Sequence, residues 1–257
     1  MINPLVTILM PCKDPKPNYF REAIKSVMSQ TSKNWRLIIV DDHSSAVSTK
    51  QLFQEVNTCA DKRITIIKNE SRFITGALNT GMRHAKTPYV CSLHCDDLLS
   101  FKAIQTLNSG INKFRNVKYF YSSRKIINAK GEVVSTLLKA RKLSDPSDFI
   151  RRSPVKPIHC WEVAAALSVG GVDESLGLQS ATDDYDFPWS MAEAGYLFKA
   201  MPECLYYYRD HYEHHRLTTH IPLQMHVEEL IKIFKKHNLS DSEIADQISR
   251  RRKRYLK

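Results

Sequence analysis

Two pairs of adjacent aspartates stand where apolar runs of the sequence end. Asp41 and Asp42 follow WRLIIV, and Asp96 and Asp97 come just after YVCSL, in the stretch LHCDD. Adjacent carboxylates repel each other, and a divalent cation with oxygen ligands relieves that repulsion. Aspartates at strand ends also cap turns and helices, which is the alternative for either pair taken alone. Two such pairs are harder to explain as caps alone, and they favour a functional site.

Four short apolar runs in the first hundred residues are the expected strands of a sheet. They are apolar on both faces, which is typical of a parallel sheet covered by helices. The runs are VTILM (6–10), WRLIIV (35–40), RITIIK (63–68) and YVCSL (89–93). After the first run, one helical face carries Phe20, Ile24, Val27 and Met28, with Asn18 as the expected N-cap. A further helix is expected over residues 75–84, and the alternation predicts a right-handed, doubly wound α/β sheet.

The predicted sheet places both aspartate pairs on one edge. In an open parallel sheet, ligands bind beyond the carboxyl ends of the strands. Asp41, Asp42, Asp96 and Asp97 all follow such ends. We therefore expect the functional site at this edge.

The sequence pattern changes after Ser100. It predicts a helix over 101–114, a strand over 117–123, a hairpin over 125–138 that turns at 129–131, helices over 161–169 and 183–194, and strands over 196–200 and 204–208. The tail from Leu223 is amphipathic. No repeat or low-complexity linker divides the body, so we expect no independent domains within it.

The overall composition favours an anionic partner and a reducing compartment. Lys and Arg outnumber Asp and Glu by 38 to 27, which gives a net charge of +11. The six cysteines are scattered without a CxxC pair, and the chain starts without a signal-like segment, so we expect a cytoplasmic protein. No apolar run approaches the roughly 20 residues that cross a bilayer, so any membrane contact is expected to be peripheral.

A series of motifs resembles the family 2 glycosyltransferases of the GT-A fold. In chain order these are VTILMPCKDPKPNYFREAIKSVMSQT, WRLIIVDDHSS, GALNTGMRHAKTPYVCSLHCDD, TDDYDFPWSMAEAGY and YYYRDH, which span roughly residues 4–215. The resemblance implies a glycosyltransferase domain over 1–220. Its halves would be a nucleotide-sugar-binding part (1–100) and an acceptor-binding part (101–220), followed by a helical basic extension (221–257).

By this resemblance, LHCDD lies where the family carries its DxD-type metal motif. Its first position is His94 instead of Asp. The match assigns Asp97 to Mn²⁺ or Mg²⁺ and Asp96 to the sugar or ribose, and the two roles could be exchanged. His211 corresponds to a histidine that completes the metal or diphosphate site, and it or Arg209 could instead stabilise the departing diphosphate. A zinc site built from Cys91, His94 and Cys95 is disfavoured, because these residues would point to opposite faces of a strand.

The resemblance also indicates a nucleotide-binding segment at the ends of the first two strands. VDDHSS matches the part that recognises the nucleobase, where Asp42 would accept a hydrogen bond from the imide N–H of uracil or thymine, and Asp41 would be structural. Pro11 would mark the turn over the base, and Lys13 would contact phosphate. A solvated loop lysine is the alternative for Lys13.

GALNTG matches the glycine-bearing segment ahead of the metal strand. Gly76 would permit close approach of the backbone to the nucleotide-sugar, and Asn79 would offer it a donor and an acceptor. The chain has Leu78 where an arginine is common in the family, so Arg72 would make the phosphate contact instead. A surface arginine is the alternative for Arg72.

TDDYDF matches the acidic segment below the acceptor site. An inverting transfer needs a carboxylate that takes the proton from the acceptor hydroxyl, and the match selects Asp184 for this role. Asp183 would lie nearby and Asp186 would give structural support. The favourable helix dipole in a first turn is the alternative reason for acidic residues here.

The resemblance therefore predicts an inverting, metal-dependent hexosyltransferase. It would move a sugar from a UDP- or dTDP-sugar to a hydroxyl of a glycan or polyprenyl-linked saccharide, in the synthesis of cell-surface polysaccharide. The basic C-terminus would attach to an anionic membrane surface or form a solvated helix. The alternatives are a nucleotide-sugar-binding protein without turnover and a basic nucleic-acid-binding protein. We expect no nucleic-acid partner, because the acidic pairs line the predicted ligand face.

Overall fold

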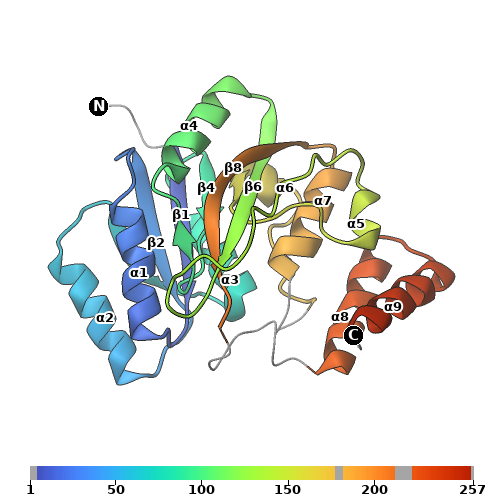
Figure 1. Cartoon of the computed structure of the whole chain (residues 1–257), viewed down its shortest axis with the longest axis horizontal. Helices are drawn as coiled ribbons and strands as arrows, with labels where there is room; N and C mark the ends of the chain where they lie inside the picture. The colour runs from blue at the N-terminus through green and yellow to red at the C-terminus, as the bar shows by residue number, and fades with distance from the viewer. Residues whose placement is uncertain (1–4, 177–181, 212–221, 256–257) are drawn as a thin grey trace.

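A computed structural model describes residues 5–176, 182–211 and 222–255. The chain forms a mixed α/β structure around a curled central sheet, with helices on both of its faces (Figure 1). The helices that follow the first strands lie at one end of the molecule, and the two C-terminal helices lie at the other. The predicted α/β class and the GT-A arrangement are confirmed.

The first half of the chain alternates strands and helices as predicted. Its elements are β1 (Val6–Cys12), α1 (Pro17–Met28), β2 (Trp35–Asp41), α2 (Val47–Thr58), β3 (Ile64–Lys68), α3 (Phe73–His84) and β4 (Tyr89–Ser92). β1 pairs in parallel with β2 and β4, and β2 pairs in parallel with β3. The N-cap prediction was wrong: α1 starts at Pro17, and Asn18 lies inside its first turn, because proline fits the first helical position.

The second half adds strands that run in both directions. Its elements are β5 (Leu98–Leu99), α4 (Ala103–Lys113), β6 (Val117–Ile127), α5 (Asp148–Arg151), β7 (His159–Glu162), α6 (Val163–Ser168), the π-helical turn η1 (Thr182–Asp186), α7 (Phe187–Glu193), β8 (Leu197–Arg209), α8 (Leu223–Lys236) and α9 (Asp241–Tyr255). The order in the sheet is β3-β2-β1-β4-β7-β6-β8-β5. The predicted turn at 129–131 is present, and antiparallel bridges pair Ile127 with Val133 and Arg124 with Leu138.

Two further predictions in this half were wrong. The helix expected to start at Trp161 starts at Val163, because residues 159–162 form β7 between β4 and β6. The two strands expected over 196–200 and 204–208 are one strand, β8, which keeps its pairing with β6 through register shifts. Both corrections arise because a strand is stabilised by neighbours that are remote in sequence.

The hydrophobic core lies on both faces of the sheet. Alternate residues of β1 divide between the faces, so Ile8 packs with Phe20 of α1, and Leu9 packs with the cluster that contains Leu78 of α3. The second cluster also contains Trp189 of α7 and Phe234 of α8. The C-terminal helices are thus part of the folded body.

Candidate active site

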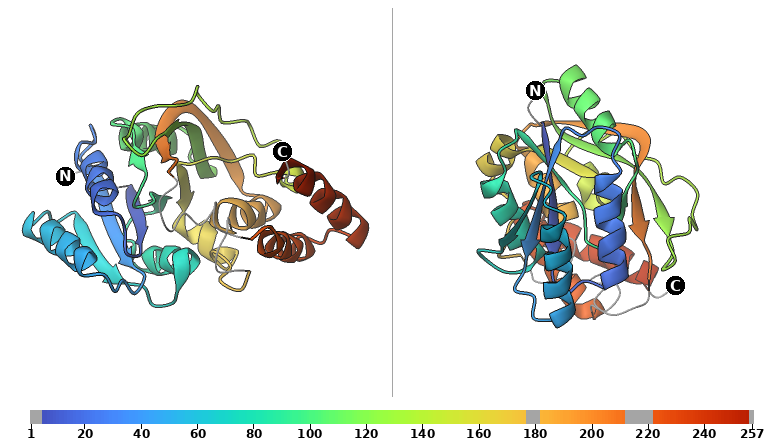
Figure 2. Two further views of the ribbon diagram at one scale, coloured as in Figure 1. Left: turned by 60° about the horizontal axis from the view of Figure 1, so that its bottom comes forward. Right: turned by 90° about the vertical axis from the view of Figure 1, so that its left-hand side faces the viewer.

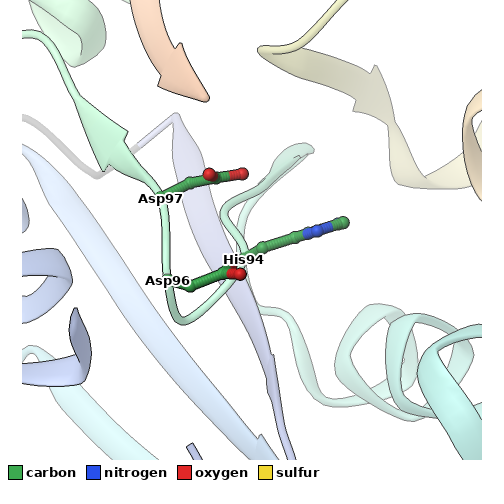
Figure 3. A group of neighbouring side chains, drawn as sticks. All are labelled: His94, Asp96 and Asp97. Atoms are coloured by element: carbon green, nitrogen blue, oxygen red, sulfur yellow. The ribbon is translucent and has the colours of Figure 1, made fainter. Parts of the chain in front are cut away.

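Three parallel strands bring the predicted site residues to one edge of the sheet. Cys12 at the end of β1 pairs with Asp41 at the end of β2, and β4 lies on the other side of β1. The loop after β4 carries His94, Asp96 and Asp97. Their side chains project to the same side of this loop (Figure 3). The predicted clustering at this edge is therefore seen in the structure.

The short strand β5, which follows this loop, pairs with the end of β8. Leu98 and Leu99 pair with Tyr207 and Tyr206 in antiparallel fashion. This pairing places the backbone N–H of Arg209 2.6 Å from Oδ1 of Asp97. Residues more than a hundred positions apart in sequence thereby meet at the carboxylates.

Asp97 is the most deeply buried member of this cluster, with 2% of its surface exposed. The hydroxyl of Tyr206 donates to its Oδ2 at 2.6 Å. Burial raises the pKa of Asp97 to about 7, and the neighbouring charge of Asp96 acts in the same direction. Burial also raises the pKa of Tyr206, and the nearby carboxylate of Asp97 adds to this rise. The fold therefore holds a carboxylate that is costly to ionise without a cation.

Asp96 has a different environment. Nε2 of His211 lies 3.2 Å from its Oδ2, and 36% of the Asp96 side chain is exposed. Burial opposes ionisation here, but the hydrogen bond with His211 and the charges of His94 and His211 lower the pKa of Asp96. Asp96 is the more accessible carboxylate of the pair.

The donor set of this cluster fits a hard divalent cation. Ligand atoms of His94, Asp96 and Asp97 all lie within 4.8 Å of one another. Within the described residues, the buried Nδ1 of His211 has no hydrogen-bond partner. Carboxylate oxygens supplemented by imidazole suit Mn²⁺, and oxygen ligands also suit Mg²⁺.

Arg209 has a structural role that the sequence did not show. The side chain is fully buried, and its Nε donates to the backbone carbonyl of Asp96 at 2.7 Å. Its guanidinium also pairs with Glu22 of α1 and lies over the ring of Tyr19, 4.4 Å from the ring centre. Tyr19 in turn contacts the ring of His211, with 5.1 Å between centroids. Tyr19 and Glu22 lie three positions apart on α1, a helical spacing that could have suggested a shared face.

Asp42 links the end of β2 to the start of α3. Its carboxylate accepts hydrogen bonds from the backbone N–H of Phe73 at 3.0 Å and from the amide of Asn69 at 2.8 Å. The Lys13 ammonium lies 3.8 Å from Oδ2 of Asp42, so these two predicted residues are brought together. Asp41 accepts from the backbone N–H of Ser44, in agreement with a structural role. Contact of Asp42 with a nucleobase stays a prediction.

Asn79 and Gly76 lie where α3 meets the turn before η1. The Asn79 amide donates to Glu174 at 2.7 Å and to the backbone carbonyl of Val172 at 2.8 Å. A Cβ on Gly76 would approach Cβ of Ser71 to 2.8 Å and Oε2 of Glu174 to 3.3 Å. In this structure both residues hold α3 against the second half, and their predicted contact with the nucleotide-sugar stays a prediction.

The remaining predicted residues lie on separate segments of the chain. Pro11 is buried in β1, and Arg72 is exposed at the position before α3. Asp184 lies on η1, and its backbone carbonyl accepts from the hydroxyl of Ser153 at 2.8 Å. Among the described residues, no contact between Asp184 and the carboxylates of Asp96 and Asp97 is seen. The role of Asp184 as a base therefore depends on the family match.

The segment that carries Asp184 packs against the C-terminal helices. The buried carboxylate of Asp186 accepts from Lys236 at 2.8 Å and lies 3.0 Å from Nε2 of His237. The His237 ring stacks on Trp189 with 3.9 Å between centroids. Arg251 of α9 donates to the hydroxyl of Tyr185 at 2.6 Å. Part of the basic tail therefore stabilises η1, while the predicted membrane contact stays a prediction.

The fold and the carboxylates at its strand ends define a GT-A type of transferase. The sequence matches the model of "Glycosyl transferase family 2" over residues 7–152, so the chain belongs to this family. This result confirms the family indicated by the sequence motifs.

Two of the curated relatives match about half of the chain. The UDP-Glc:alpha-D-GlcNAc-diphosphoundecaprenol beta-1,3-glucosyltransferase WfgD of Escherichia coli is 28% identical over 141 residues, 54% of this chain and 53% of that protein. The uncharacterized glycosyltransferase MJ1057 of Methanocaldococcus jannaschii is 28% identical over 135 residues, 52% of this chain and 46% of that protein. The chain thus spans about half the length of these relatives.

Solved structures share the fold over nearly the whole chain. TarS of S. aureus in complex with UDP-GlcNAc has a TM-score of 0.69 at 14% identity, covering 95% of this chain and 70% of that one. The mannosyltransferase PcManGT of Pyrobaculum calidifontis, with GDP-Man and Mn²⁺, has a TM-score of 0.63 at 15% identity, covering 96% and 69%. Within the described part of the chain, no helix is both long and apolar enough to span a bilayer.

Proposed function

We propose that this glycosyltransferase is metal-dependent and inverting, and that it uses a UDP- or dTDP-sugar. The carboxylate pair Asp96 and Asp97, with His94 and His211 beside it, carries the proposal. Asp97 and His211 would hold Mn²⁺ or Mg²⁺, with Asp96 toward the sugar or ribose. When bound, the cation neutralises charge on the departing diphosphate. The complexes of TarS with UDP-GlcNAc and of PcManGT with Mn²⁺ support this assignment by analogy of fold.

The remaining site residues would bind and orient the donor. Asp42 and Pro11 would face the nucleobase, and Lys13 and Arg72 would approach the phosphates from the ends of β1 and β3. Gly76 and Asn79 would shape the wall formed by α3. The contacts of Asp42 with Phe73 and Asn69 support this role indirectly, because they fix its carboxylate before a ligand arrives.

Asp184 would act as the general base. It would accept the proton of the acceptor hydroxyl while that oxygen attacks the anomeric carbon from the face opposite the diphosphate. The acceptor would be a hydroxyl of a glycan or of a polyprenyl-linked saccharide in polysaccharide synthesis. WfgD, whose name specifies a diphosphoundecaprenol acceptor, supports this class.

Two measurements test this function. A thermal-shift titration with UDP should show stabilisation that depends on Mn²⁺, because a ligand that binds only the native state raises the melting temperature. Asp184→Asn should keep this shift and lose sugar transfer by about a hundredfold or more, the range for removal of a general base. A UDP shift that is the same in EDTA, or full turnover by Asp184→Asn, would remove the corresponding assignment.

A further inference from the structure

A basic cavity of about 470 Å³ lies in the second half of the chain. It is formed by the segment after the hairpin and by α5, which lies beside α9 (Figure 2). Its walls carry four cationic side chains: Arg141, Lys142, Arg151 and Arg152. A volume of this size is within the range of small-molecule sites.

Few acidic groups of the protein neutralise the cationic side chains that line this cavity. Within the described residues, none of the four forms an ion pair with a carboxylate. Asp148 is the acidic residue of the lining, and its Oδ2 already accepts hydrogen bonds from the backbone N–H groups of Ser144 and Asp145, at 2.9 and 3.3 Å. Cations that share a concave surface focus a positive field and attract anions.

Neighbouring residues extend this positive field. Burial lowers the pKa of Lys156, and the charges of Arg124, Arg152 and Arg141 lower it further. A second cavity of about 120 Å³ shares Arg151 with the first and is lined by arginines of α9. Cationic side chains therefore line both of these neighbouring cavities.

The basic cavity lies beside the segment that carries the proposed base. Ser153, between the lining residues Arg152 and Pro154, donates its hydroxyl to the backbone carbonyl of Asp184 at 2.8 Å. Lys156 is attracted by the charge of Asp184. An anion in the cavity would therefore be close to η1, in the half of the chain expected to bind the acceptor.

We propose that the basic cavity binds a phosphate or diphosphate group carried by the acceptor. Guanidinium groups match phosphate oxygens in bidentate fashion, and three of the four cations are arginines. The bound phosphate would fix the saccharide so that its hydroxyl reaches Asp184. This inference rests on the proposed function and adds the charge class of the acceptor to it.

Inorganic pyrophosphate is the probe for this cavity. Its affinity is measured by calorimetry in EDTA for the full chain, for the double variant Arg151→Gln/Arg152→Gln and for Arg141→Gln. Arg141→Gln should bind about tenfold more weakly, since one charged hydrogen bond to phosphate contributes this much, and the double variant, which loses two such groups, should bind about a hundredfold more weakly. The control is Arg115→Gln, an exposed arginine between α4 and β6 that does not line the cavity. It should bind like the unaltered chain.

Vesicles distinguish the two sources of phosphate. A lipid-linked phosphate is supported if the chain binds both pyrophosphate and phosphatidylglycerol vesicles, and if both affinities are reduced in the cavity variants. Pyrophosphate binding without vesicle binding supports a soluble phosphorylated acceptor. Vesicle binding without pyrophosphate binding, or equal pyrophosphate affinity in the cavity variants and Arg115→Gln, overturns the proposal.

The proposed function is tested separately in the same variants. The Mn²⁺-dependent shift with UDP should be unchanged in all of them, because the altered residues lie outside the carboxylate edge. If the unaltered chain shows no such shift, the donor assignment fails. The pyrophosphate comparison still decides whether the cavity binds phosphate.

Discussion

Replacing Asp97 by asparagine should stabilise the protein in EDTA and abolish the response to Mn²⁺. The side chain is nearly the same size, and its amide can accept from the backbone N–H of Arg209 and donate to the hydroxyl of Tyr206. The variant therefore keeps both contacts while it removes a buried charge. The loss of that charge also removes the repulsion from Asp96.

The size of the gain follows from the raised pKa of Asp97. A pKa of about 7 in the fold, against about 3.9 in an unfolded chain, corresponds to an ionisation cost on the order of 4 kcal/mol above pH 7. The sign follows from proton binding: between these two values the folded state holds the proton more tightly. Rising pH therefore destabilises the fold across this window, and the cost is constant above it. The gain from Asp97→Asn should be largest at pH 8 and fall to less than half at about pH 5.

Urea unfolding in EDTA at both pH values measures this gain. A partly exposed aspartate with a cationic partner, Asp61, is the matched control. The hydrogen bond with Arg63 lowers the pKa of Asp61, so Asp61→Asn should lose about 1 kcal/mol at pH 8. If Asp97→Asn also lost stability at pH 8, Asp97 would be a structural acceptor and the reasoning for a cation site would fail.

Three further predictions concern the framework of the site. Burial opposes ionisation of Asp14, but hydrogen bonds from the Ala46 and Ser45 amides at the start of α2 lower its pKa. Asp14→Asn should therefore cost about 1 kcal/mol in urea unfolding at pH 7 and less near pH 3; an equal cost at both would exclude a role for the charge. His237→Phe keeps the stack on Trp189 but loses the contacts with Asp186 and Glu193, so unfolding free energy should fall by about 1.5–3 kcal/mol, and an unchanged value would contradict the docking of α8. Gly171 has a φ of +74°, and a Cβ there would lie 2.6 Å from Oδ1 of Asn79, so Gly171→Ala should lower the melting temperature by at least several degrees, which calorimetry can check.

The early strands and helices could be predicted because their signals are local. β1, β2, β3 and β4 are continuous apolar runs, and α1 and α3 show helical spacing. β7 is four residues long and is stabilised by pairing with β4 and β6, so its own sequence gives little indication of it. Strand pairing across a large separation is the information that local patterns lack.

The candidate site was predictable in its acidic residues and less so in their partners. Asp96 and Asp97 are recognisable from their position after a strand, but Tyr206 and Arg209 reach them only through the pairing of β5 with β8. The amphipathic tail shows the same limit. Its period predicts an apolar face, and the structure shows that Leu230 and Phe234 of this face pack into the core.

Among the residues that the structure describes, three aspartates are buried, and they show how the proposed cation site differs from a structural carboxylate. Asp186 contacts two cationic side chains, Lys236 and His237, and Asp42 has an ammonium group 3.8 Å away together with a backbone donor. The charge of each is compensated by the chain itself. Asp97 receives its two hydrogen bonds from neutral donors and lies beside another carboxylate. Of these three, Asp97 is the one whose negative charge the chain does not neutralise, and the cation of the proposed function would balance it.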